Sequence, residues 1–109
     1  MLLPKDGKIV LIHEPVSARY GAPRMLDLLY SNYFDFFWNG VEQLTIITFN
    51  ESLSICKIFN IDAYGHTCAT RRLKKGRFRQ MLFEGRLPTT ISRRALEKLL
   101  TEGTISLSR

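Results

Sequence analysis

Metal-binding motifs are scarce in this sequence. It contains two cysteines, Cys56 and Cys68, and two histidines, His13 and His66. Zinc sites usually take four ligands from two closely spaced pairs, and the sequence does not contain this spacing. We therefore expect no metal and no cofactor, and we interpret the cysteines as a pair of reduced, buried thiols on neighbouring strands.

Motifs that carry catalytic chemistry are also missing. The ten acidic residues are scattered along the chain, and no glycine-rich phosphate loop or serine nucleophile motif occurs. The sequence therefore predicts that the chain is not an enzyme by itself and has no catalytic residues. One alternative stays open, a small ribonuclease in which His66 or His13 acts as general acid and base.

Long apolar runs are absent as well. No stretch approaches the roughly 20 apolar residues of a membrane-spanning helix. Lys5, Asp6 and Lys8 interrupt the N-terminal apolar stretch, which makes it a poor signal peptide, so we expect a cytoplasmic protein. With 109 residues, 45% of them hydrophobic, the chain can build a core, and we predict a single domain over residues 1–109.

Positive charge, by contrast, is abundant and concentrated in one segment. Residues 71–94 hold nine Lys and Arg and one acid, whereas the rest of the chain holds seven Lys and Arg and nine acids. A local excess of this kind favours a surface that binds a polyanion, and DNA is the expected partner. The alternative is an ordinary solvated face.

The cations of this segment are expected to contact the phosphate backbone. The predicted nucleic-acid-binding residues are Arg71, Arg72, Lys74, Lys75, Arg77, Arg79, Arg93 and Arg94. Arg93 and Arg94 directly follow Ser92, a predicted helix N-cap. Two cations at this position oppose the helix dipole, and a bound phosphate would offset that repulsion.

The hydrophobic patterns predict an α+β fold. We expect an antiparallel sheet of about four to five strands, arranged as a meander, and two main helices, one after the first strand and one at the C-terminus. The expected strands span residues 9–12, 44–49, 53–59 and about 66–73, and a return strand is expected over 78–83. Turns are expected at 50–52 and 62–65.

The first helix is expected to include Pro23 in an early turn, with Ser17 as a candidate N-cap, and to end at the turn residues Asn39 and Gly40. Residues at helical spacing form a wide apolar stripe, which predicts a largely buried helix. The stripe comprises Met25, Leu26, Leu28, Leu29, Tyr33 and Phe36 or Phe37.

The C-terminal helix is expected to begin after the N-cap Ser92, with Ile91 packed on Leu96 as a hydrophobic staple, and to stop at Gly103. Its buried stripe is predicted to be Ala95, Leu96, Leu99 and Leu100.

Three segments in this order resemble a known family, the TnpB-type small accessory protein encoded by the second reading frame of IS-sixty-six-family insertion sequences. They are an Arg-x-Gly helix start, a basic residue-Leu-x-x-Gly-Arg-Phe signature, and a capped helix with a Leu-x-x-Leu-Leu core. The matching residues are Arg19 and Gly21, then Arg72, Leu73, Gly76, Arg77 and Phe78, then Ser92, Leu96, Leu99, Leu100 and Gly103.

The resemblance implies an accessory protein of transposition, with the catalytic acidic triad on a separate transposase. Our leading hypothesis is therefore a non-catalytic protein that binds nucleic acid through its basic surface. The alternative is a protein–protein adaptor that contacts the transposase of the same element. Its surface would be the basic segment or the aromatic stretch "YSNYFDFFW", and exposed rings at Phe36, Phe37 and Trp38 would favour such an interface or a homodimer.

Overall fold

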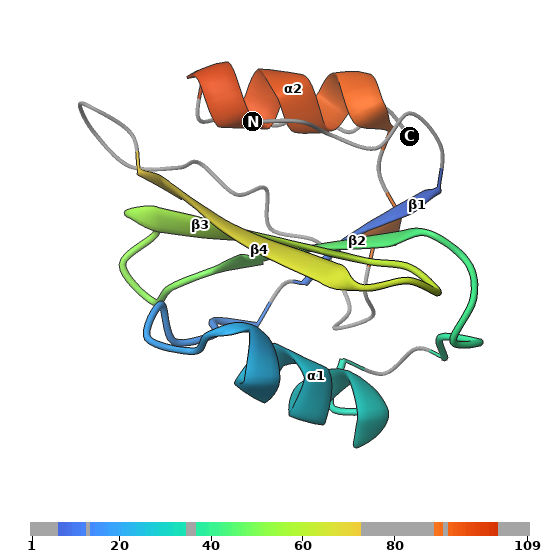
Figure 1. The fold of residues 1–109 in the computed structure, drawn as a ribbon. Coiled ribbons are helices and arrows are strands. Elements are labelled where there is room, and N and C mark those ends of the chain that lie inside the picture. The colour runs from blue at the N-terminus through green and yellow to red at the C-terminus, as the bar shows by residue number, and fades with distance from the viewer. Residues whose placement is uncertain (1–6, 13, 35–36, 73–88, 91, 103–109) are drawn as a thin grey trace.

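The protein forms a mixed β-sheet with one helix on each face (Figure 1). The structure, a computed structural model, describes residues 7–12, 14–34, 37–72, 89–90 and 92–102. The predictions for the strand over 78–83, for the staple residue Ile91 and for the helix stop at Gly103 lie outside these residues.

The sheet has five strands in the order β4-β3-β2-β1-β5. Their bounds are Lys8–Leu11 (β1), Leu44–Phe49 (β2), Ile55–Ile61 (β3), His66–Arg72 (β4) and Thr89–Thr90 (β5). Strands β2, β3 and β4 form an antiparallel meander joined by short turns, as the alternation of apolar residues predicted.

The first strand is the exception, because β1 pairs with β2 in parallel. The sheet is therefore mixed and not wholly antiparallel. The connection from β1 to β2 contains helix α1, Ala22–Tyr30, which crosses one face of the sheet and returns the chain in the same direction. The α+β class and the positions of both helices are confirmed.

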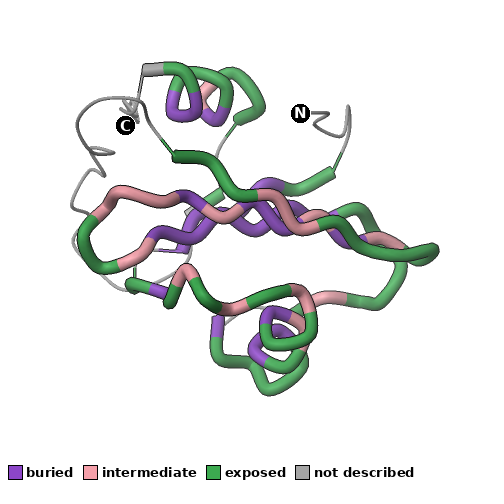
Figure 2. Tube along the Cα trace, turned by 60° about the vertical axis from the view of Figure 1, so that its left-hand side comes forward, coloured by how far each residue is buried: buried purple, intermediate pink, exposed green. Residues whose placement is uncertain are grey.

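Two hydrophobic clusters cover the two faces of the sheet, and both pack against the same central strands. Figure 2 shows that these strands are the most continuously buried part of the chain. Leu44 and Ile46 of β2 belong to the cluster under α1, whereas Ile47 and Phe49 belong to the cluster under α2, Arg93–Glu102. Successive side chains of a strand point to opposite faces, and β2 is buried on both. Strand β2 therefore contributes buried side chains to both hydrophobic clusters.

The two cysteines lie on the neighbouring strands β3 and β4, as predicted, and both are free thiols, but only Cys56 is buried, whereas Cys68 at the edge strand is partly exposed. They point to opposite faces of the sheet, because Cys56 belongs to the cluster under α2 and Cys68 packs against the cluster under α1. Burial raises the pKa of the Cys56 thiol to about 12.

Helix α1 ends at Tyr30, well before the predicted turn at Asn39 and Gly40. Asn32 adopts a left-handed conformation with φ 62°, its N–H donates to Leu29 O at 3.3 Å, and the N–H of Tyr33 donates to Leu28 O at 3.0 Å. These two bonds form a Schellman C-cap, and asparagine is one of the few residues that tolerates its left-handed position. Tyr33 therefore leaves the predicted buried stripe and is 50% exposed.

The start of α1 also differs in part from the prediction. Gly21 is its N-cap and Pro23 lies in its first turn, where the fixed φ of proline is compatible with a helix. Ser17 lies further upstream and does not cap the helix. Its hydroxyl accepts a hydrogen bond from the N–H of Arg19 at 3.2 Å.

Helix α2 begins as predicted. The Ser92 hydroxyl accepts a hydrogen bond from the N–H of Ala95 at 3.1 Å, which satisfies a backbone donor of the first turn. Leu96, Leu99 and Leu100 are buried against the sheet, while Ala95 is partly buried. Across the part of the chain that the structure describes, neither helix is long and apolar enough to cross a membrane.

Candidate functional site

Half of the eight predicted nucleic-acid-binding residues belong to the described part of the structure. Arg71 and Arg72 end β4, and Arg93 and Arg94 begin α2. All four are exposed. The other four, Lys74, Lys75, Arg77 and Arg79, lie outside the described residues.

The two arginines of β4 project to opposite faces of the sheet. Arg71 pairs across the ladder with Cys56, which belongs to the cluster under α2, and Arg72 pairs with the neighbouring residue Ile55. Directly opposite residues on antiparallel strands share a face, so Arg71 lies on the α2 side and Arg72 on the α1 side. A DNA duplex bound to one face of the sheet would therefore contact only one of these two arginines.

Arg71 has an evident structural role. Its Nε–H donates to the carbonyl oxygen of Leu100 at 3.1 Å, in the last turn of α2. The last carbonyls of a helix have no partners within the helix, and the helix dipole favours a cation there. Arg71 therefore ties the end of β4 to the end of α2.

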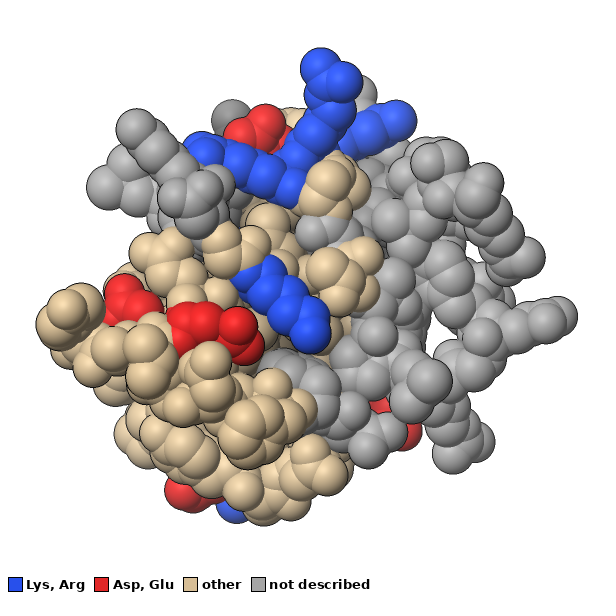
Figure 3. All heavy atoms as spheres, turned by 90° about the vertical axis from the view of Figure 1, so that its right-hand side faces the viewer, with Lys and Arg blue, Asp and Glu red and all other residues tan. Residues whose placement is uncertain are grey.

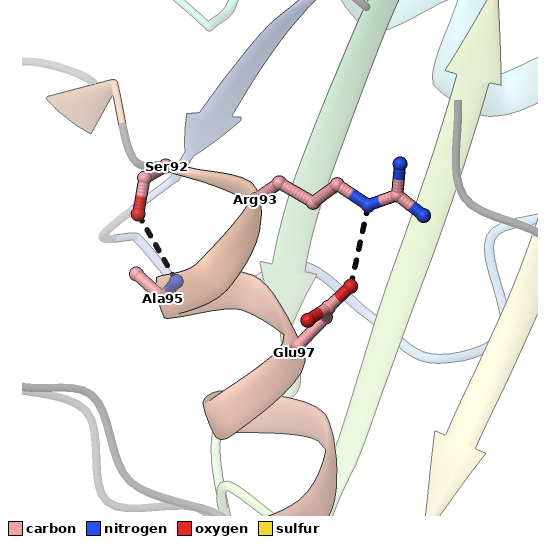
Figure 4. A network of polar contacts seen from close by, with 4 residues as sticks. All are labelled: Ser92, Arg93, Ala95 and Glu97. Carbon is pink, nitrogen blue, oxygen red and sulfur yellow. Dashed lines mark hydrogen bonds and ion pairs between the residues drawn. The ribbon is translucent and has the colours of Figure 1, made fainter. Parts of the chain in front are cut away.

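The two arginines of α2 lie at its other end. Arg93 is seven positions from Leu100, which corresponds to about 10 Å along the helix axis. The Nε–H of Arg93 donates to Glu97 Oε1 at 3.2 Å, one turn along the exposed surface (Figure 4). The side chain of Arg94 has neither a hydrogen bond nor an ion pair to another described residue, and it lies one helical turn from Lys98 on an exposed flank of α2.

Figure 3 shows how charge is distributed over one face of the molecule. Lys and Arg side chains gather at the top, where α2 lies, with an acidic side chain among them, while Asp and Glu side chains lie lower on the same face with basic side chains near them. Along the sequence the two signs of charge are separated more sharply. Residues 25–56 contain four acids and neither Lys nor Arg, whereas residues 71–94 contain nine Lys and Arg.

Exposed aromatic rings surround the end of α1. Phe37 is 83% exposed, Tyr30 is 70% exposed and Tyr33 is 50% exposed, whereas Phe34 is buried and anchors this segment in the core. Phe36 lies outside the described residues. Rings with so much exposed apolar surface are unusual outside interfaces when several occur together.

Trp38 completes this group of rings and is held in place. Its indole Nε1–H donates to the carbonyl oxygen of Glu42 at 2.8 Å, and its ring lies 6.2 Å from that of Tyr30, tilted by 43°. Together with Leu29, Asn32 and Phe37, the two rings line a cavity of about 350 Å³. We call Tyr30, Tyr33, Phe37 and Trp38 the aromatic patch.

The described histidine does not form a catalytic arrangement with its neighbours. His66 is exposed and meets the ring of Phe59 edge to face, with 5.8 Å between centroids. The nearby Asp62 carboxylate accepts hydrogen bonds from the N–H groups of Tyr64 and Gly65 at 2.8 and 3.0 Å, so it closes the β3–β4 turn. Within the described ranges, His, Cys, Asp and Glu form no group of three or more that could hold a metal ion.

The sequence indicated part of this arrangement. It identified the cations and noted the aromatic stretch, but it did not reveal the structural role of Arg71 or the exposure of Tyr30 and Tyr33. Comparisons with protein-family models, with curated proteins and with solved structures gave no match.

Proposed function

We propose that this chain is a non-catalytic accessory protein of transposition that binds DNA through the cations of residues 71–94. The observation that carries the proposal is the concentration of nine of the sixteen Lys and Arg in this segment, beside a single acid. The resemblance to the TnpB-type accessory proteins of IS-sixty-six-family elements supplies the biological setting. The transposase of such an element would supply the chemistry.

The described arginines divide into two groups by availability. Arg72 and Arg94 are exposed, and neither side chain makes a hydrogen bond or ion pair with another described residue. Arg93 is exposed but paired with Glu97, and Arg71 is bonded to the helix α2. Arg71 and Arg93 each use one guanidinium N–H in these contacts, so the side chains of Arg72 and Arg94 have more donors available for backbone phosphates, although they lie on opposite faces of the sheet.

The proposal is tested by binding of fluorescent duplex and single-stranded DNA over a salt series. If about six phosphates are neutralised, log K falls against log salt with a slope of about −5. A Lys74→Ala, Lys75→Ala, Arg77→Ala variant should reduce the affinity and flatten this slope. The matched control is Arg19→Ala, which removes an exposed arginine outside residues 71–94 and should leave both nearly unchanged.

The result that overturns the proposal is the absence of DNA binding at low salt by folded native protein. Equal losses for the triple variant and for Arg19→Ala would also count against it, because they would indicate a general charge effect rather than a local surface.

The alternative function is an adaptor that contacts the transposase, and a specific observation favours it. Phe37 is 83% exposed beside Tyr30 and the cavity at Trp38, as an interface would require. In this case a Phe37→Ser variant should lose the transposase in a pull-down with the purified partner, while DNA binding stays intact. The corresponding control is Tyr64→Ser, because Tyr64 is 98% exposed and lies outside the aromatic patch.

A further inference from the structure

We propose that the aromatic patch, together with Asp27 and Glu42, binds the basic α2 surface of a second copy of this chain. This inference goes beyond the proposed function, because it requires no nucleic acid and no transposase. It rests on two surfaces of this chain that complement each other in charge and lie on opposite faces of the sheet.

The first surface combines exposed rings with carboxylates. Asp27 is exposed on α1, three residues before Tyr30, so the two side chains are neighbours on the helix surface. Glu42 is exposed and its carbonyl oxygen holds the indole of Trp38. Arg24 lies three residues before Asp27 on the same helix. Its guanidinium is 5.2 Å from the centre of the Tyr20 ring and forms no ion pair with Asp27, whose carboxylate is therefore available to a partner.

The combination of exposed rings and carboxylates indicates what kind of partner binds this surface. Bases of single-stranded nucleic acid stack on exposed rings, but their phosphates would then approach the carboxylates of a segment, residues 25–56, that contains neither Lys nor Arg. Cationic side chains suit both features, since guanidinium groups stack on aromatic faces and pair with carboxylates. The occupant is therefore a cationic protein surface.

The chain itself presents such a surface on the other face of the sheet. Arg93 and Arg94 are exposed at the start of α2, with Lys98 one turn further along, and Glu97 is the acid between them. Helix α1 and helix α2 cover opposite faces (Figure 1). Contact between the α1 side of one copy and the α2 side of the next is heterologous, so it can continue into open chains of copies.

The test is sedimentation velocity of the full chain without nucleic acid, over a range of concentrations at low and at high salt. We expect self-association that grows with concentration and weakens at high salt, since the contact pairs opposite charges. Phe37→Ser and Arg94→Glu should each weaken it by at least about tenfold. Tyr64→Ser, which removes an equally exposed ring outside the patch, should associate like the native chain.

Mixing the two variants gives the sharpest result. Phe37→Ser keeps an intact α2 surface and Arg94→Glu keeps an intact aromatic patch, so the mixture should form one-to-one pairs that do not grow further. If the native chain stays monomeric at all concentrations at low salt, the proposal is wrong. It is also wrong if Arg94→Glu associates as well as the native chain, because the rings of two copies would then be packing on each other.

Failure here is distinguishable from failure of the proposed function. DNA binding is measured separately by the salt series, at protein concentrations too low for self-association, where Phe37→Ser should leave the affinity for DNA unchanged. Conversely, if the protein both binds DNA and self-associates as proposed, added duplex DNA should dissociate the linear oligomers, because phosphates compete for the α2 cations.

Discussion

Replacing Arg71 with alanine should destabilise the fold more than it weakens DNA binding. The substitution removes the bond from the guanidinium to Leu100 O and leaves a carbonyl of the last helical turn without this partner. Hydrogen bonds to charged groups contribute about 1.5–3 kcal/mol, and an exposed cation at a helix C-terminus about 0.3–1 kcal/mol. Because Arg71 is exposed, we expect a loss at the low end, about 1–2 kcal/mol.

The adjacent residue supplies the matched control. The side chain of Arg72 lies on the other face of the sheet and makes no hydrogen bond to a described residue, so Arg72→Ala should change the free energy of unfolding by less than about 0.5 kcal/mol. For a chain of this size, the loss at Arg71 should lower the urea midpoint by about 1 M. Circular dichroism over a urea series measures both variants.

The DNA-binding assay completes the comparison. Arg72→Ala should reduce the affinity for DNA without changing stability, and Arg71→Ala should do the reverse. If Arg71→Ala unfolds at the native urea midpoint and loses as much DNA affinity as Arg72→Ala, the structural role assigned to Arg71 is refuted.

Three further predictions concern the stability of the fold. Thr48 Oγ1 is buried without a hydrogen-bond partner among the described residues, so Thr48→Val should raise the thermal midpoint by roughly 4 °C, and a lower midpoint would contradict this. Gly7 has φ +103°, and a Cβ there would lie 2.7 Å from the Cβ and carbonyl oxygen of Gln43, so Gly7→Ala should lose at least about 2 kcal/mol in urea unfolding, whereas a native midpoint would refute the clash. The unfolded Cys56 thiol titrates near 9.0 and burial raises its pKa to about 12, so the unfolded chain loses this proton first and stability falls as pH rises through that window. A Cys56→Ala variant should show a shallower fall of stability over this window, and identical slopes would contradict the assignment.

The sequence predicted those helices and strands whose residue pattern is compatible with only one kind of secondary structure. The near-continuous run of apolar and β-branched residues in β2 reflects a strand packed on both faces, and Ser92 before a leucine stripe is a local signal that the capped helix α2 reproduces. The early end of α1 was missed because Asn32 interrupts the helix through its backbone conformation, while apolar residues continue beyond it. The direction of β1 was missed as well, since apolar periodicity is the same for parallel and antiparallel strands.

The candidate site was predictable in composition but not in arrangement. The cations of residues 71–94 are evident from the sequence, and the period of a strand already implies that Arg71 and Arg72 diverge. Which of them meets α2 depends on where the helix packs, and this is a tertiary property. The exposure of Tyr30 and Phe37 likewise depends on the turn of the chain after α1. From the sequence alone, aromatic residues next to a buried stripe could equally well belong to the core.

The parallel pairing of β1 and β2 also determines the order in which the sheet can assemble. Strands β2, β3 and β4 are joined by short turns, so their pairing closes small loops, whereas β1 reaches β2 only after residues 12–43 have been brought back. Closing the longer loop has the larger entropic barrier, and local pairings therefore form first. We expect the amides of the meander to gain protection early in a refolding experiment, and those of β1 to gain it later, when the second edge of β2 is covered.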